Sequence, residues 1–307
     1  MHYQHAPKVA PRIMIPWDGI TELGQLVAFA RLLGGEQCAP MLLPIAPSVE
    51  DDDTLALAMA ASHLEQDVGL FPMEVLDPLS ASGDPALGIA NVAASHDTTF
   101  MLMATSCHPA GQLDPSCLAA QLALDSPIPV MVVHVDCDKP ESCMPTVTRL
   151  IISLDGSSRA RQALPFAAEL AQRLCLPVQL LMVLDPKQIL PPAYAYDPDA
   201  AVDMVAGLQH DAHRALTEAE RFLLDREVVV TSELLFGPVI SCLETSVQPG
   251  DLLVMTTHGI DQASQGRLGS VAAALVANPP GPLVIMRCSL PPDIVAHPSL
   301  RTAAWVS

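Results

Sequence analysis

The stretch Asp251–Gly259, DLLVMTTHG, is followed after nine further residues by Gly269-Ser270-Val271. Its first five residues read as a buried strand, and the apolar run from Val271 to Val276 is typical of a helix. Glycines between a strand and a helix let backbone N–H groups approach an anion, and the first N–H groups of the helix point at it. Arg267 adds a charge nearby. The pattern predicts a phosphate-binding loop, although a plain crossover is a common alternative.

A second apolar strand, Arg149–Leu154, ends in Asp155-Gly156-Ser157. In an open parallel sheet, ligands bind outside the carboxyl ends of the strands. At that position Asp155 could accept a hydrogen bond from a base amine or a ribose hydroxyl. The alternative is that Asp155 or Ser157 only caps the helix that follows. Taken alone, the segment favours the capping role.

Together with the strand Val178–Val183, these segments resemble the universal stress protein family. In that family a loop of the form Gly-x2-Gly-x9-Gly-Ser/Thr holds ATP phosphates, an Asp after the first strand holds the adenosine, and a Val lines the adenine. The chain matches the family at Asp155, Val183, Gly259, Gly269 and Ser270. It departs at two positions, because Thr256 replaces the first glycine of the loop and Ser153 replaces a proline that commonly precedes the Asp.

The front half of the chain repeats the back half. Arg12, Ile15, Asp18 and Gly19 recur as Arg149, Ile152, Asp155 and Gly156, and the run Phe100–Thr105 recurs as Leu252–Thr257. The repeat predicts two domains, residues 8–136 and 147–288, joined by the linker Asp136–Thr146 and followed by a tail, residues 289–307. The second copy is about fifteen residues longer. We expect this insertion at Pro191–Asp199, where turn-forming residues replace any periodicity.

The two copies differ at the glycine loop. The first copy has Ser106-Cys107 and Cys117-Leu118 where the second has His258-Gly259 and Gly269-Ser270. Its loop also contains prolines, which remove N–H donors. The first copy is therefore expected to be a degenerate domain that does not bind ATP.

Alternating strands and helices predict parallel sheets. The resemblance implies the same architecture: two Rossmann-like α/β domains of the adenine nucleotide alpha hydrolase type, each a five-stranded open sheet with helices on both faces. In the second copy we expect strands at 150–154, 178–183, 228–235, 252–255 and 282–287, and helices at 159–174, 201–224, 239–247 and 271–276.

Composition restricts the function classes. The formal net charge of −19, with only fifteen Lys and Arg residues, argues against nucleic acid and anionic membrane partners. No apolar run approaches the roughly 18 residues of a membrane span. The first residues lack the apolar segment of an export signal, so a cytoplasmic location is expected. The eight cysteines form no Cys-x-x-Cys pair, which favours reduced thiols over disulfides.

Other candidate sites are weaker. His96, Cys107, His108 and Cys117 fit no common zinc pattern. His210 and His213, one helical turn apart, are expected on a solvated helix face. His258 has no acid or nucleophile beside it in the sequence, which favours a structural role over that of a catalytic base.

The resemblance implies an ATP-binding regulatory module of the stress response, with Mg²⁺ as a candidate companion. The implied nucleotide-binding residues are Asp155, Val183, Met255, Thr256, Gly259, Arg267, Gly269, Ser270 and Val271. Two alternatives stay open: a nucleotide-free interaction protein of the same family, and a slow ATP hydrolase or nucleotidyl-transfer enzyme. The family also pairs domains through the last strand, here Val130–Val133 and Leu283–Met286, which leaves a homodimer optional and the protein partner unknown.

Overall fold

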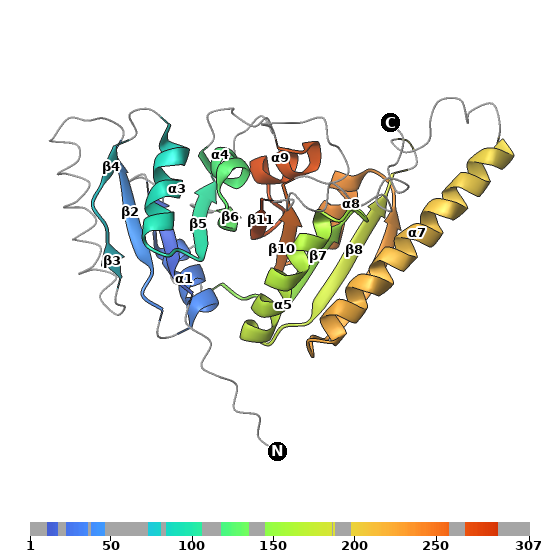
Figure 1. The fold of residues 1–307 in the computed structure, drawn as a ribbon, viewed down its shortest axis with the longest axis horizontal. Coiled ribbons are helices and arrows are strands. Elements are labelled where there is room, and N and C mark those ends of the chain that lie inside the picture. The colour runs from blue at the N-terminus through green and yellow to red at the C-terminus, as the bar shows by residue number, and fades with distance from the viewer. Residues whose placement is uncertain are drawn as a thin grey trace, which may run out of the picture. The chain divides into compact units, whose positions relative to one another are not determined.

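The structure is a computed structural model. It describes residues 11–17, 23–35, 38–46, 73–80, 84–105, 118–134, 145–185, 187, 198–257 and 268–287. The chain divides between Thr146 and Val147 into two compact units, whose elements are labelled in Figure 1.

The first unit is an α/β structure with a parallel sheet. Its strands are β1 (Ile13–Trp17), β2 (Met41–Ala46), β3 (Glu74–Val75), β4 (Leu79–Ser80), β5 (Phe100–Thr105) and β6 (Val130–His134). Its described helices are α1 (Leu23–Gly34), α3 (Pro85–Ser95) and α4 (Leu118–Asp125). The strands lie in the order β3-β2-β1-β5-β6, and β4 pairs with β2.

The second unit has the same construction. Its strands are β7 (Arg149–Leu154), β8 (Val178–Leu184), β9 (Val230–Phe236), β10 (Asp251–Thr256) and β11 (Leu283–Met286). Its helices are the 3-10 turn η1 (Ala160–Gln162), α5 (Ala163–Leu174), α7 (Pro198–Leu224), α8 (Val239–Ser246) and α9 (Ser270–Ala277). All pairings are parallel, in the order β9-β8-β7-β10-β11. The α/β fold class predicted from the sequence is confirmed.

Small differences from the expected elements occur where local signals compete. The helix expected from Arg159 begins as η1 and becomes α-helical only at Ala163. Helix α7 begins at Pro198 and thus includes the last two residues of the expected insertion, because proline fits the first turn of a helix. The remainder of Pro191–Asp199 lies outside the described residues, as does most of the expected linker.

The two units share one strand order. The order β3-β2-β1-β5-β6 corresponds position by position to β9-β8-β7-β10-β11. The register agrees as well, since Ile13 lies opposite Phe100 as Leu150 lies opposite Leu252. This agreement is what an internal duplication predicts.

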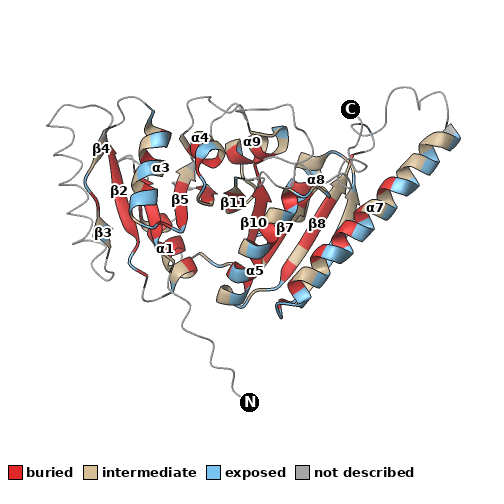
Figure 2. Cartoon of the chain, viewed as in Figure 1, coloured by how far each residue is buried: buried red, intermediate tan, exposed pale blue. Residues whose placement is uncertain are grey.

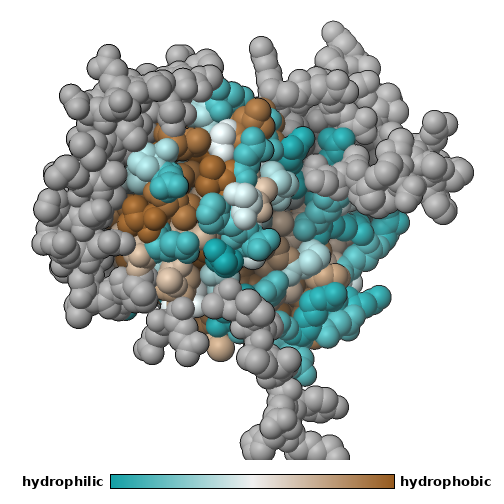
Figure 3. Space-filling model, turned by 60° about the vertical axis from the view of Figure 1, so that its left-hand side comes forward, coloured by the Kyte–Doolittle hydropathy of each residue, from teal (hydrophilic) through white to brown (hydrophobic). Residues whose placement is uncertain are grey.

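The central strands of each unit form its core (Figure 2). Every residue of β1 and of β10 is buried, as expected for parallel strands with both faces covered. At the edge of the second unit, β9 is half-buried or exposed along its length. In the view of Figure 3, hydrophobic residues gather in the left part of the described surface. Among the described residues of the first unit, Leu87 of α3 is the one large hydrophobic side chain classed as exposed, at 56%.

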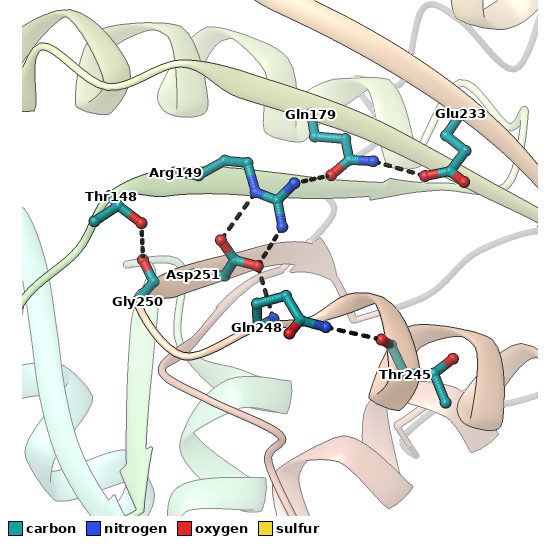
Figure 4. A network of polar contacts seen from close by, with 8 residues as sticks. All are labelled: Thr148, Arg149, Gln179, Glu233, Thr245, Gln248, Gly250 and Asp251. Atoms are coloured by element: carbon teal, nitrogen blue, oxygen red, sulfur yellow. Dashed lines mark hydrogen bonds and ion pairs between the residues drawn. The ribbon is translucent and has the colours of Figure 1, made fainter.

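A chain of polar side chains crosses β10, β7, β8 and β9 in the second unit (Figure 4). The Arg149 guanidinium donates to both carboxylate oxygens of Asp251, from Nε at 2.9 Å and from Nη2 at 2.5 Å. Its Nη1 donates to Gln179 Oε1 at 2.6 Å, and Gln179 Nε2 donates to Glu233 Oε2 at 2.8 Å. The Asp251 side chain is 3% exposed. The hydrogen bonds to Asp251 raise the pKa of Arg149, which holds the guanidinium in its charged form.

The corresponding arginine of the first unit has weaker partners. Thr99 occupies the place of Asp251, and its hydroxyl donates to the Arg12 carbonyl. The Arg12 guanidinium contacts Met41 Sδ at 3.4 Å and Glu74 at 4.0 Å. The side chains of Arg12 and Glu74 are 48% and 55% exposed, so solvent screens this pair. The bidentate ion pair is therefore a property of the second unit.

We expect Arg149→Met to lower the free energy of unfolding by about 1–3 kcal/mol, because Asp251 would be left buried without its charged donor. Urea unfolding followed by circular dichroism measures this loss. Arg12→Met is the matched control and should cost less than about 1 kcal/mol, since Arg12 lies in an exposed pair. Equal losses in the two variants would contradict the assignment of the ion pair as a stabilising contact.

Candidate functional site

The candidate site lies at the carboxyl ends of β7, β8 and β10. The register pairs Leu154 with Met182 and Ile152 with Val254. One step further along β7 and β8, Asp155 is level with Val183. Three steps beyond Ile152 and Val254, Asp155 is also level with Thr257. The structure therefore brings the predicted adenosine residues Asp155 and Val183 to the same edge of the sheet as the start of the glycine loop.

Asp155 begins a tight turn. Its Oδ1 accepts a hydrogen bond from the Ser157 N–H at 2.9 Å, and Ser157 Oγ accepts one from the Ala160 N–H at 3.1 Å. Gly156 between them has φ +83°, a left-handed conformation that favours glycine. The Ser157 hydroxyl thus contacts the first residue of η1, whose N-cap residue is Arg159. The half-buried Asp155 carboxylate is held in a fixed position by the same turn.

A backbone hydrogen bond closes the base of the glycine loop. The Gly269 N–H donates to the Thr257 carbonyl at 3.0 Å, and the Thr257 N–H donates to the Met286 carbonyl at 2.9 Å. The two ends of the loop therefore lie next to each other, tied to β11. Gly259, Arg267 and His258 lie outside the described residues, so their predicted roles rest on the sequence.

Helix α9 begins at this closure without a side-chain cap. Gly269 is its N-cap residue, with φ −56° and ψ 150°, and no side chain caps the helix. The first bond of the helix runs from the Ala273 N–H to the Gly269 carbonyl. The geometry of an α-helix leaves the N–H groups of Ser270, Val271 and Ala272 without a partner inside the helix. The first turn also contains no acidic residue, so its electrostatic environment favours an anion.

Met255 and Thr256 do not line the same face of the sheet. Successive side chains of a strand point to opposite faces. The register puts Met255 on the face that carries Val183, and Thr256 on the other face. Thr256 is buried at 6% exposure. Of these two implied nucleotide-binding residues, Met255 thus shares a face with Val183, and Thr256 lies on the opposite face.

One buried acid at this edge escaped the sequence analysis. Asp185, just after β8, is 6% exposed, and its Oδ1 accepts a hydrogen bond from the Lys187 N–H at 3.0 Å. It lies two residues after Val183. The signal was available, because Asp185 follows an apolar strand just as Asp155 does.

Of the weaker candidates, Cys107, His108 and Cys117 lie outside the described residues. His96 Nδ1 lies 3.0 Å from the Val92 carbonyl, at the end of α3. His210 and His213 are exposed on α7, as expected for a solvated face. Across the described ranges, no group of three His, Cys, Asp or Glu side chains is placed to hold a metal ion. None of the helices that the structure describes has the length and apolar character needed to cross a membrane.

Comparisons with known proteins point to one family. The model of the universal stress protein family matches residues 146–287. Two universal stress proteins of Mycobacterium tuberculosis, Rv2028c and Rv3134c, are each 29% identical over 51% and 52% of this chain. The chain spans about half the length of these relatives, 52% of each.

Solved structures agree on the fold. A universal stress protein from Archaeoglobus fulgidus superimposes with a TM-score of 0.61 at 16% identity, covering 90% of this chain and 98% of that one. A putative universal stress protein from Pseudomonas aeruginosa gives a TM-score of 0.59 at 15% identity, covering 94% and 96%. Together with the sequence match over residues 146–287, these similarities support a relation of the chain to the universal stress protein family.

Proposed function

We propose that this protein is a stress-related regulatory protein that binds ATP at the carboxyl edge of its second unit. The observation that carries the proposal is one juxtaposition. Asp155 and Val183 are level with Thr257 at one edge of the sheet, and the hydrogen bond from Gly269 to Thr257 holds the uncapped end of α9 at the same edge.

The residues divide into two groups by chemistry. Asp155 is a carboxylate acceptor suited to ribose hydroxyls or a base amine, and Val183 and Met255 offer apolar surface for adenine. The N–H groups of Ser270 and Val271 are donors for phosphate oxygens. Gly269 keeps the N-cap free of a competing side chain, and Gly259 and Arg267 would complete the loop.

Mg²⁺ is proposed as a companion of the nucleotide. The chain has a formal net charge of −19, and the described part of the site supplies backbone donors in place of lysine or arginine. A hard cation with oxygen ligands would offset the charge of the triphosphate. The carboxylate of Asp185 at this edge is compatible with such an ion.

A nucleotide-free interaction protein of the same family is the second candidate. Thr256 stands where the family pattern has the first glycine of the loop, and this departure favours the nucleotide-free candidate. Mass spectrometry of small molecules that copurify with the protein separates the two candidates. A copurifying adenine nucleotide supports the ATP-binding protein. If no nucleotide copurifies and ATP added at a saturating concentration does not bind, the nucleotide-free protein is supported.

Isothermal titration of the full chain with ATP and magnesium should give one site per chain. The reason is that the first unit lacks both loop glycines. Two equal sites would show that the loop between Cys107 and Cys117 binds nucleotide after all.

Gly269→Asp should abolish or strongly weaken ATP binding while leaving the fold at least as stable. Aspartate is a good N-cap residue and φ −56° suits it, but its charge would occupy the place of the phosphate. Gly269→Asn is the matched control, since it caps without a charge. We expect the Asp variant to bind ATP about tenfold more weakly than the Asn variant, and equal affinities would remove α9 from the site.

Asp155→Asn should weaken ATP binding about tenfold, because a neutral acceptor replaces a charged one. The amide oxygen can still accept the Ser157 N–H, so the thermal midpoint should stay close to that of the wild type. Asp155→Ala removes the acceptor for ATP and for the Ser157 N–H, so it should lower both the ATP affinity and the thermal midpoint. If Asp155→Asn binds ATP like the wild type, Asp155 serves only the turn.

A further inference from the structure

Helix α7 has one buried face and one exposed face. Leu208, Ala212, Leu216, Ala219 and Leu223 share the buried face, against β8, β9 and α5. The opposite face is exposed from Asp199 onward, and the first turns of α7 extend past the ends of β8 and β9 (Figure 1). This exposed face carries a definite order of side chains.

The order is acidic, small, then basic. Asp199 and Asp203 begin the face, Ala206 and Gly207 follow, and His210 and Arg214 come next, all exposed. At 3.6 residues per turn these positions lie in one stripe along the helix. Val202 flanks the stripe with 67% of its surface exposed. A stripe with opposite charges at its two ends is complementary to itself when two copies run antiparallel.

The spacing fits such a pairing. Asp199 lies seven residues before Ala206, and Arg214 lies seven residues after Gly207. Asp203 lies three residues before Ala206, and His210 lies three residues after Gly207.

A two-fold axis between Ala206 and Gly207 would therefore bring each aspartate of one helix opposite a basic residue of the other. An interface of this kind uses the same patch on both copies.

Gly207 supports the same conclusion from a different direction. Glycine inside a helix is unfavourable relative to alanine. Gly207 does not have a positive φ, and a Cβ placed on it would meet no atom within 4 Å. Neither the backbone conformation of Gly207 nor its packing against the described residues requires glycine there. A glycine at the crossing point of two helices allows their backbones to approach closely.

We propose that the exposed face of α7, from Asp199 to Arg214, is a docking surface for a second copy of this chain, with the two helices antiparallel about Gly207. Arg214 forms an exposed ion pair with Asp211 at 3.1 Å in the single chain. Such a pair is weak, so Arg214 is available to Asp199 of the second copy. The net charge of −19 on each chain opposes association, which makes the dimer weak and dependent on these local contacts.

Sedimentation velocity of the full chain over a range of concentrations tests the surface. The wild type should dimerise. Arg214→Glu should raise the dissociation constant of the dimer about tenfold or more, because both symmetry-related contacts between residue 214 and Asp199 of the other copy become repulsive. Arg221→Glu is the matched control: it makes the same change on the same exposed face but beyond the overlap of the two helices, and it should leave the dimer unchanged. Asp199→Lys combined with Arg214→Glu should restore association.

Gly207→Gln is a second test, because it should change the thermal stability of the chain and the strength of the dimer in opposite directions. Glutamine is a better helix former than glycine, so the thermal midpoint should not fall, while the bulk at the crossing should weaken the dimer. A monomeric wild type at the highest soluble concentration would overturn the proposal. A dimer that persists unchanged in Arg214→Glu and Gly207→Gln would also overturn it, because association would then use another surface.

Discussion

The parallel register of β7 with its two neighbours is the constraint on which the second unit depends. One residue of slip between β7 and β10 would move every buried side chain of β10 to the opposite face. Arg149 and Asp251 lie directly opposite each other at the amino ends of these strands, and their two charge-assisted hydrogen bonds form only in this register. Apolar packing among Leu, Ile and Val is compatible with several similar registers. The bidentate ion pair to the buried Asp251 carboxylate forms in only one of them.

The same register determines what meets at the other end of the sheet. Asp155 and Val183 are level because each follows one residue after a pair of β7 with β8. Asp155 and Thr257 are level because each follows three residues after a pair of β7 with β10. Polar contacts at the amino edge and candidate ligand contacts at the carboxyl edge thus occupy separate parts of the strands. The first unit has the same strand order, but Thr99 replaces Asp251 and the loop glycines are missing. The two units share their strand order and differ in the side chains at both edges.

The sequence predicts much of this arrangement, for identifiable reasons. Runs such as Leu252–Met255 are apolar without interruption, so the strands follow from the pattern, and the parallel sheet follows from their alternation with helices and from the resemblance. The pair between Arg149 and Asp251 was not predictable, because the two residues are far apart in the chain and only the register joins them. Met255 and Thr256 are adjacent in the sequence, but their side chains lie on opposite faces of the sheet because side chains alternate along a strand. Element ends were less accurate where capping residues compete, as at Pro198.

Glycine is informative in this chain when nothing local explains it. Gly156 has a left-handed conformation within a turn, so its presence needs no ligand. Gly269 adopts an ordinary φ, and its lack of a side chain matters because it leaves the end of α9 uncapped. Gly207 has an ordinary conformation, no described residue would meet a side chain there, and glycine weakens the longest described helix. Nothing in the described part of the chain offsets the loss of helix propensity at Gly207. The self-complementary charges around Gly207 indicate that contact with a second copy offsets this loss.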